Sequence, residues 1–114
     1  MSCLFNSLSY HIKLESQQIR QLICDYLRHN KPIIDGMETH EVLNLEGQDY
    51  VQKMRRASTW GGAIEIQCAC HIWHTKINVF NQRDNTTIEF LPLDGNFLSV
   101  ISLSWNGSHF EAIK

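Results

Sequence analysis

The stretch Ala63-Ile64-Glu65-Ile66-Gln67-Cys68-Ala69-Cys70-His71-Ile72-Trp73, followed by His74-Thr75-Lys76-Ile77-Asn78-Val79-Phe80, decides the fold class. Residues 63–73 are apolar on nearly every side of a helix, which predicts a helix buried at the centre of the molecule. After His74 the period changes, and Ile77 and Val79 alternate with their neighbours as they would in a strand. The chain therefore changes from helix to strand at this point.

Upstream of this change the apolar pattern is helical. Apolar residues at positions 4, 5, 8 and 12 predict a helix over 4–14 that starts directly after Cys3. A second helix begins at Ser16, which can cap it, and ends before Pro32. Shorter helices are expected over 40–45 and, with Asp49 as the cap, over 50–54. The first half of the chain is therefore expected to be helical.

Downstream, the alternating pattern continues to the last residues. It predicts strands over 76–80, 86–91, 97–105 and 108–113. The dipeptide Asn106-Gly107 is the strongest hairpin signal, and it should fold the last strand back against the one before it. Helices followed by strands predict an α+β fold, with helices packed around a small, mostly antiparallel C-terminal sheet. We expect one domain over residues 1–114.

Composition excludes several classes of protein. The 114 residues are 43% hydrophobic and 19% charged, which is typical of a globular domain. A net charge of -2 offers no basic surface for nucleic acid, and no apolar stretch approaches the ~20 residues of a membrane span. The four cysteines are expected to be reduced thiols. A soluble intracellular protein that binds neither nucleic acid nor membrane is therefore expected, and we also expect it to be cytoplasmic and monomeric.

Cys3 is the candidate nucleophile. A cysteine reacts as its thiolate, which a helix N-terminus and a neighbouring imidazole both favour. The predicted helix supplies the first condition, and His109, at the start of the last predicted strand, is placed to supply the second. From the residues alone the pairing stays open, because the chain has six histidines and a single cysteine of this kind is more often inert.

A metal site is the alternative constellation. Cys68, Cys70, His71 and His74 lie within seven residues, and Cys70 and His74 have the i, i+4 spacing that lets two helical side chains share zinc. Cys68 and Cys70, however, point about 200 degrees apart on a helix, so one helix cannot supply all four ligands. We therefore expect no metal, with these residues serving as core thiols and capping histidines.

Three separated blocks of sequence resemble one protein family. They are Cys3-Leu4-Phe5-Asn6-Ser7-Leu8-Ser9, then Trp60-Gly61-Gly62-Ala63-Ile64-Glu65-Ile66, and finally Ile101-Ser102-Leu103 with Ser108-His109-Phe110-Glu111. In this order they are similar to the nucleophile segment, the Trp-Gly-Gly turn and the final strand of ovarian tumour (OTU) cysteine proteases, including the compact viral type. The blocks span nearly the whole chain.

The resemblance implies a deubiquitinase that needs no cofactor. Such an enzyme cleaves the isopeptide bond after the C-terminal Gly-Gly of ubiquitin or a ubiquitin-like protein, in the cytoplasm or, for a viral protein, in the host cytoplasm. It implies Cys3 as nucleophile, His109 as base and Glu111, two positions later, as the group that orients the imidazole. The turn Trp60-Gly61-Gly62 would wall the channel for the substrate's Gly-Gly. If Glu111 is not the third member, Asn106 is the nearest polar alternative.

One departure from the family pattern motivates other functions. The family commonly has Asp-Gly before the nucleophile segment, whereas only Met1 and Ser2 precede Cys3. A domain truncated at its N-terminus, or an incomplete oxyanion hole, is the expectation. A catalytically silent ubiquitin-binding module is therefore the second hypothesis, and a small zinc-binding regulatory protein is the third. Glu65 is expected on the helix surface, with bonds to backbone or arginine groups as the alternative.

Overall fold

The structure, a computed structural model, describes residues 2–114. Within these residues all the helices precede all the strands. The helices are α1 (Cys3–Ile12), α2 (Ser16–Arg28), α3 (Thr39–Glu46), α4 (Tyr50–Met54) and α5 (Ala63–Trp73), and the strands are β1 (Thr75–Asn81), β2 (Thr86–Phe90), β3 (Ser99–Trp105) and β4 (Phe110–Ala112). The predicted α+β class is confirmed.

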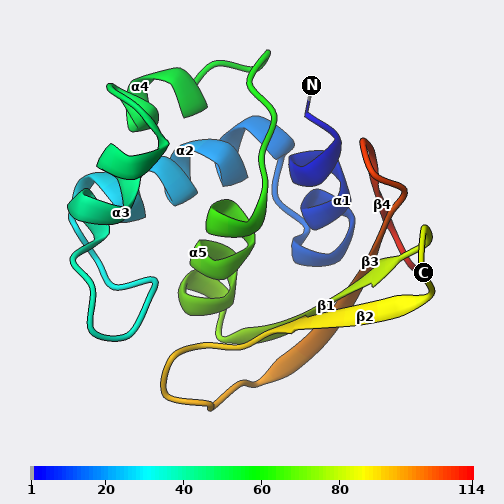
Figure 1. Ribbon diagram of the computed structural model, residues 1–114. Helices are drawn as coiled ribbons and strands as arrows, with labels where there is room; N and C mark the ends of the chain where they lie inside the picture. The colour runs from blue at the N-terminus through cyan, green and yellow to red at the C-terminus, as the bar shows by residue number, and fades with distance from the viewer. Residues whose placement is uncertain (1) are drawn as a thin grey trace.

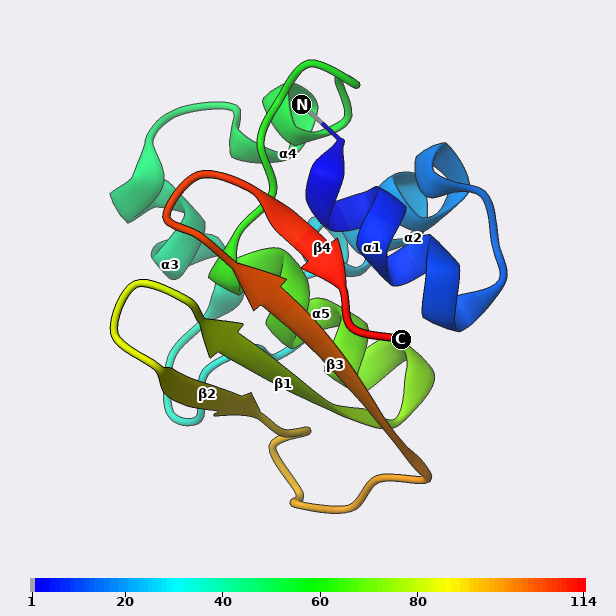
Figure 2. The same ribbon diagram turned by 90° about the vertical axis from the view of Figure 1, so that its right-hand side faces the viewer.

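The strands form one sheet in the order β2-β1-β3-β4. The outer pairs, β1 with β2 and β3 with β4, are antiparallel, as expected for two hairpins. The central pair, β1 with β3, is parallel, with Ile77 opposite Ile101 and Val79 opposite Leu103. The sheet is therefore mostly antiparallel, as predicted, around a parallel pair that the strand pattern did not reveal. Figure 2 shows β3 returning beside β1 on the side away from β2.

The helices cover one face of the sheet (Figure 1). Helix α5 packs on β1, and α2 packs on α5. The prediction of a buried central helix is confirmed, because Cys68, Ala69 and Cys70 are fully buried. Their neighbours in the core include Phe5 from α1 and Ile23 from α2, which joins the first half of the chain to the sheet.

Most predicted boundaries lie within two residues of the observed ones, and the difference at the last strand affects the candidate site. Helix α1 ends at Ile12 rather than at residue 14, because Lys13 has a φ of 72° that stops the helix. The last strand begins at Phe110, not at residue 108. His109 therefore lies in the turn before β4 rather than in the strand, which corrects the prediction for its backbone.

A buried arginine fixes the start of α1. Arg20 of α2 is fully buried and donates hydrogen bonds to the carbonyls of Met54 (2.7 Å) and Ala57 (3.3 Å) and to Ser2 Oγ (3.3 Å). Its guanidinium also lies 4.1 Å from the centre of the Phe5 ring. These contacts hold the segment that contains Cys3 against α2 and the residues after α4.

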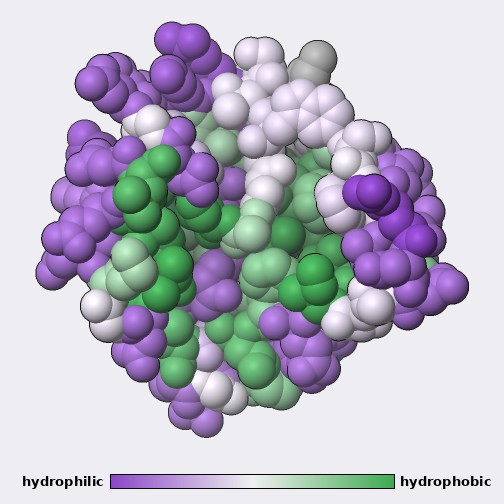
Figure 3. Space-filling model, viewed as in Figure 1, coloured by the Kyte–Doolittle hydropathy of each residue, from purple (hydrophilic) through white to green (hydrophobic). Residues whose placement is uncertain are grey.

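Apolar side chains also reach the surface, where they mix with polar ones (Figure 3). Leu45 and Leu98 are the most exposed, at 80% and 89%. None of the helices within residues 2–114 combines the length and the apolar character needed to cross a bilayer.

Candidate active site

Cys3 and His109 lie in the same cleft, between α1 and the turn that leads into β4. The cleft has a volume of about 330 Å³, and its lining also includes Asn6, Ser7 and Glu111. Helix α1 packs directly against β4, and Figure 2 shows the two side by side. Cys3 is the first residue of α1 and only 8% exposed, so its thiol sits where the free N–H groups of the helix begin. The fold thus brings together the nucleophile and base inferred from the sequence.

Glu111 lies in β4, two residues after His109 in the turn, and the two side chains approach each other. Its Oε1 lies 3.8 Å from His109 Nε2, which is an ion-pair distance but too long for a hydrogen bond. The His109 side chain is 49% exposed and that of Glu111 is 70% exposed. Such contacts between catalytic groups are often loose before substrate binds and shorten in the complex. Glu111 can therefore orient the imidazole through Nε2.

The turn that carries His109 is closed by Asn106. Asn106 Oδ1 accepts hydrogen bonds from the backbone N–H groups of Ser108 (3.0 Å) and His109 (2.9 Å). The Asn106 N–H in turn donates to the His109 carbonyl at 3.2 Å. The predicted Asn-Gly hairpin is confirmed as the connection between β3 and β4. An asparagine that starts a turn commonly accepts hydrogen bonds from the backbone of the residues that follow. This signal could have identified the bond between Asn106 and the His109 N–H, which was not predicted.

The turn Trp60-Gly61-Gly62 borders a cavity that adjoins the Cys3 cleft. Gly61 and Gly62 line an apolar cavity of about 280 Å³ together with Phe110, which also lines the Cys3 cleft. Trp60 is 51% exposed and lines a different hollow of about 230 Å³, to which both glycines also contribute. The turn is thus adjacent to the cleft through Phe110, whereas Trp60 lines neither the cleft nor the apolar cavity beside it.

Glu65 is buried, so its predicted surface position is wrong. It is 1% exposed, and its two carboxylate oxygens accept hydrogen bonds from the Gly62 N–H (2.7 Å) and the Tyr50 hydroxyl (2.6 Å). Burial raises the pKa of this carboxyl above its ordinary range. A glutamate three residues after the helix cap is the spacing of a capping box, and this signal could have identified its role. Glu65 fixes the start of α5 and with it the Trp60-Gly61-Gly62 turn.

Comparison with known proteins settles the family. The family model for OTU-like cysteine proteases matches residues 2–104, which include Cys3 and the Trp60-Gly61-Gly62 turn and end before His109. The chain belongs to this family. Ubiquitin thioesterase otu2 of Schizosaccharomyces pombe is 28% identical over 98% of this chain and 42% of its own length. OVARIAN TUMOR DOMAIN-containing deubiquitinating enzyme 10 of Arabidopsis thaliana is also 28% identical, over 98% of this chain and 32% of its own length. The chain thus spans less than half of either relative.

Solved structures show the same fold. An OTU domain in complex with ubiquitin superposes with a TM-score of 0.80 at 24% identity, covering 97% of this chain and 62% of that one. The viral OTU domain protease from Dera Ghazi Khan virus gives a TM-score of 0.70 at 20% identity, covering 99% and 76%. The family and the fold inferred from the three sequence blocks are both confirmed.

The remaining cysteines of this OTU-like domain are core thiols. Cys24, Cys68 and Cys70 are fully buried, and burial raises the pKa of Cys24 to about 11, that of Cys70 to about 12 and that of Cys68 further in the same direction. His74 is not on the helix with Cys70, because it ends α5 in the left-handed conformation with a φ of 49°. Between residues 2 and 114 no three metal-ligating side chains converge, so the zinc hypothesis is unsupported.

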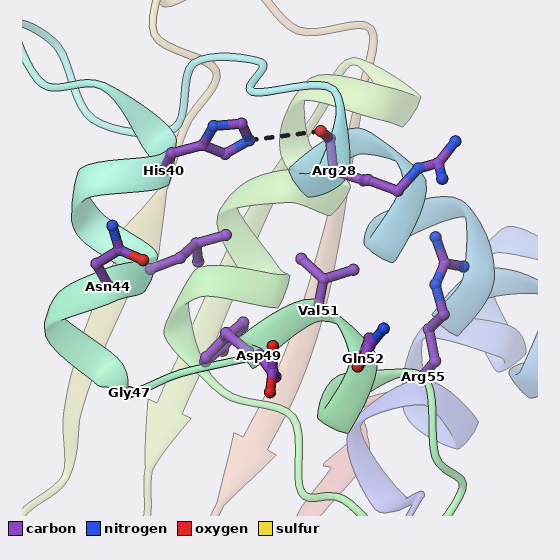
Figure 4. A pocket seen from close by; sticks show the side chains of 10 residues that line it. Arg28, His40, Asn44, Gly47, Asp49, Val51, Gln52 and Arg55 are labelled. Carbon is purple, nitrogen blue, oxygen red and sulfur yellow. Dashed lines mark hydrogen bonds between the residues drawn. The ribbon is translucent and has the colours of Figure 1, made fainter.

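A larger cavity lies away from the cleft, among α2, α3 and α4. It has a volume of about 500 Å³, and its lining includes Arg28, His40 and Arg55 (Figure 4). The imidazole of His40 points toward the backbone carbonyl of Arg28, with Nε2 3.4 Å from the oxygen. No cysteine lines this cavity, so it cannot host thiol chemistry. The cleft between α1 and β4 is therefore the candidate active site of this OTU-like domain.

Proposed function

We propose that this protein is a cysteine-dependent deubiquitinase that hydrolyses the isopeptide bond after the C-terminal Gly-Gly of ubiquitin or a ubiquitin-like protein. The observation that carries the proposal is the shared cleft of Cys3, His109 and Glu111, at the first residue of a helix. Relatives named ubiquitin thioesterase and a structural neighbour solved with ubiquitin support the choice of substrate. We further propose that it acts as a monomer in the cytoplasm, or in the host cytoplasm if the protein is viral.

In the first half of the reaction His109 accepts the Cys3 proton. The sulfur attacks the carbonyl carbon of the terminal glycine, and the carbonyl oxygen becomes an oxyanion. The first helical hydrogen bond of α1 runs from the Asn6 N–H to the Ser2 carbonyl (2.8 Å), so the N–H groups of Leu4 and Phe5 precede it and are available as oxyanion donors. A helix start is suited to this task because its N–H groups point along the axis toward the nucleophile.

In the second half His109 acts first as an acid and then as a base. It returns the proton to the departing lysine amine, which leaves a thioester between Cys3 and ubiquitin. It then takes a proton from water, whose oxygen attacks the thioester and releases the ubiquitin carboxylate and the free thiol. Since Glu111 lies nearest to Nε2 of His109, Nδ1 is the nitrogen that exchanges protons with the thiol.

In our proposal the Trp60-Gly61-Gly62 turn makes the enzyme select substrates with small residues at their C-terminus. Its glycines and Phe110 form an apolar wall that continues from the cleft, and an extended Gly-Gly segment is slim enough to pass beside such a wall. In our proposal Trp60 covers the outer side of this channel. Larger residues in place of the substrate glycines should therefore be excluded.

A ubiquitin probe with a C-terminal electrophile tests the proposal. We expect one covalent adduct on the wild-type protein, located by peptide mass spectrometry at Cys3. Cys3→Ala should give no adduct, and His109→Ala should form one far more slowly. If ubiquitin binds without any adduct, the protein is a silent ubiquitin-binding module and the proposed hydrolase activity is wrong.

A further inference from the structure

Asn106 binds both backbone polar groups of His109. Its Oδ1 accepts from the His109 N–H at 2.9 Å, and its own N–H donates to the His109 carbonyl at 3.2 Å. The same Oδ1 accepts from Ser108 twice, from the N–H at 3.0 Å and from the hydroxyl at 3.3 Å. One side-chain oxygen thus closes the whole turn that presents the imidazole.

Little else restrains the backbone of His109. It lies before the first residue of β4, so no strand pairing fixes it, and its side chain is half exposed. The turn is instead held against the β1–β2 connection. Gly107 has a φ of +107°, and a Cβ at that position would lie 2.8 Å from Cδ of Arg83. The Asn106 bonds, this close contact and a bond from the Gln82 N–H to the Trp105 carbonyl (2.9 Å) keep the turn in place.

We propose that Asn106 is a positioning residue for catalysis, acting through the backbone of His109. The inference rests on the proposed function, in which His109 exchanges protons with Cys3. Asn106 is not among the residues that line the cleft, and its Oδ1 is bonded to backbone, so it acts neither on substrate nor on the imidazole. This role differs from that of Glu111, whose contact is with the ring itself. A shift of the imidazole by ~1 Å can cost about 100-fold in rate, so a fixed turn matters.

Steady-state kinetics on a ubiquitin C-terminal substrate give the first test. Asn106→Ala should lower kcat by roughly 10-fold to 100-fold and leave KM within about twofold, because only the base is displaced. Asn106→Asp should retain activity to within about threefold, since a carboxylate oxygen accepts the same bonds. Asn106→Gln, with its oxygen one methylene further out, should behave like the alanine variant and supplies a second loss of function if alanine does not fold.

Asp94→Ala is the matched control. Asp94 Oδ1 accepts from the Asn96 N–H (2.9 Å), as Asn106 Oδ1 accepts from the Ser108 N–H (3.0 Å). Its turn joins β2 to β3, and Asp94 does not line the cleft. This variant should keep wild-type kcat. An equal loss of kcat in Asp94→Ala and Asn106→Ala would overturn the inference, because any broken turn would then suffice.

A mutant cycle that needs no ubiquitin separates this inference from the proposed function. We would measure the alkylation rate of Cys3 by a small haloacetamide in the wild type, Asn106→Ala, His109→Ala and the double variant. Asn106→Ala should slow alkylation at least about threefold when His109 is present and have no effect when it is absent. An equal effect in both backgrounds, or none in either, would overturn the role of Asn106. If this cycle behaves as expected while ubiquitin substrates stay uncleaved, only the proposed substrate is wrong.

Discussion

The three side chains of the site differ greatly in exposure. Cys3 is 8% exposed, whereas the side chains of His109 and Glu111 are 49% and 70% exposed. A carboxylate this exposed is screened by water, so its effect on the imidazolium is weaker than that of a buried one. The contribution of each side chain to catalysis should therefore decrease from Cys3 to His109 to Glu111.

The first prediction is an order of residual activities. Cys3→Ala should abolish turnover, since no other group can form the thioester, and His109→Ala should reduce kcat by about 1,000-fold, within the usual range for a lost acid–base catalyst. Glu111→Ala should reduce it by about 10-fold, and Glu111→Gln by less, because the amide oxygen still accepts a hydrogen bond. Hydrolysis of a fluorogenic ubiquitin C-terminal amide measures all four. Wild-type rates in Glu111→Ala would indicate a Cys3–His109 dyad.

Gly61 allows the second prediction at this scale. A Cβ at Gly61 would lie 2.7 Å from Cδ2 of Leu4 and 2.9 Å from Cε2 of Phe5, whereas at Gly62 nothing lies within 4 Å. Gly61→Ala should therefore destabilise the fold by about 1–3 kcal/mol through overpacking, and Gly62→Ala by less than about 1 kcal/mol. Urea denaturation of both variants gives the comparison. Similar losses at the two positions would contradict the close packing of the turn on α1.

At the scale of elements, the start of α5 depends on a buried carboxyl group. Glu65 joins α5 to α4 through the Tyr50 hydroxyl and to the preceding turn through the Gly62 N–H. Because burial raises the pKa of Glu65, the folded protein keeps this proton at pH values where the unfolded chain has lost it. The unfolding free energy should therefore fall as the pH rises from the ordinary carboxyl pKa of 4.5 to the raised value.

Glu65→Gln tests this dependence. Glutamine does not titrate, so the variant should lack the Glu65 contribution, and its stability relative to wild type should improve as the pH rises through that window. Urea denaturation from about pH 4 to about pH 8 measures the difference at each pH. A constant difference would mean that Glu65 has the same pKa in the folded and unfolded states.

Elements whose neighbours in sequence are also their neighbours in space were predictable. Helix α5 was bounded correctly by its apolar run, and the β3–β4 hairpin by Asn106-Gly107. The parallel pairing of β1 with β3 was not, because period-2 alternation describes a strand and not its partner. Glu65 is an intermediate case, because the capping-box spacing indicates its bond to Gly62, whereas its bond to Tyr50 of another helix is not visible in a local pattern.

At the scale of the whole molecule, the cysteines fall into two groups, those in the hydrophobic core and the one that lines the cleft. Cys24 of α2 meets Cys68 and Cys70 of α5 in one hydrophobic core, while Cys3 lines the cleft. We predict that a small thiol reagent modifies Cys3 in the native protein. The other three cysteines should react only at the rate at which the protein unfolds. Mass spectrometry over time, with and without denaturant, resolves the two phases. Cys3→Ala is the control and should lose the early phase alone.

The site itself was only partly accessible from residue patterns. Periodicity placed Cys3 at a helix start, and six histidines then stood as equal candidates for its partner. The resemblance to a family selected His109, because a pattern of local periods carries no information on contacts between distant segments. Asn106 was considered only as a substitute for Glu111, since the shift of His109 from strand to turn is a property of the folded hairpin.

The positions of Cys3 and His109 in the sequence determine the stage of folding at which the cleft can form. Cys3 and His109 are 106 positions apart (109 minus 3), and β4, which follows His109, both pairs with β3 and packs on α1. Closing contacts over so long a separation is entropically costly and comes late in folding. A nascent chain on the ribosome therefore carries an isolated thiol without its base until the last strand has emerged. We infer that the domain stays silent until β4 has left the ribosome and becomes reactive in one step, when the β3–β4 hairpin closes over α1.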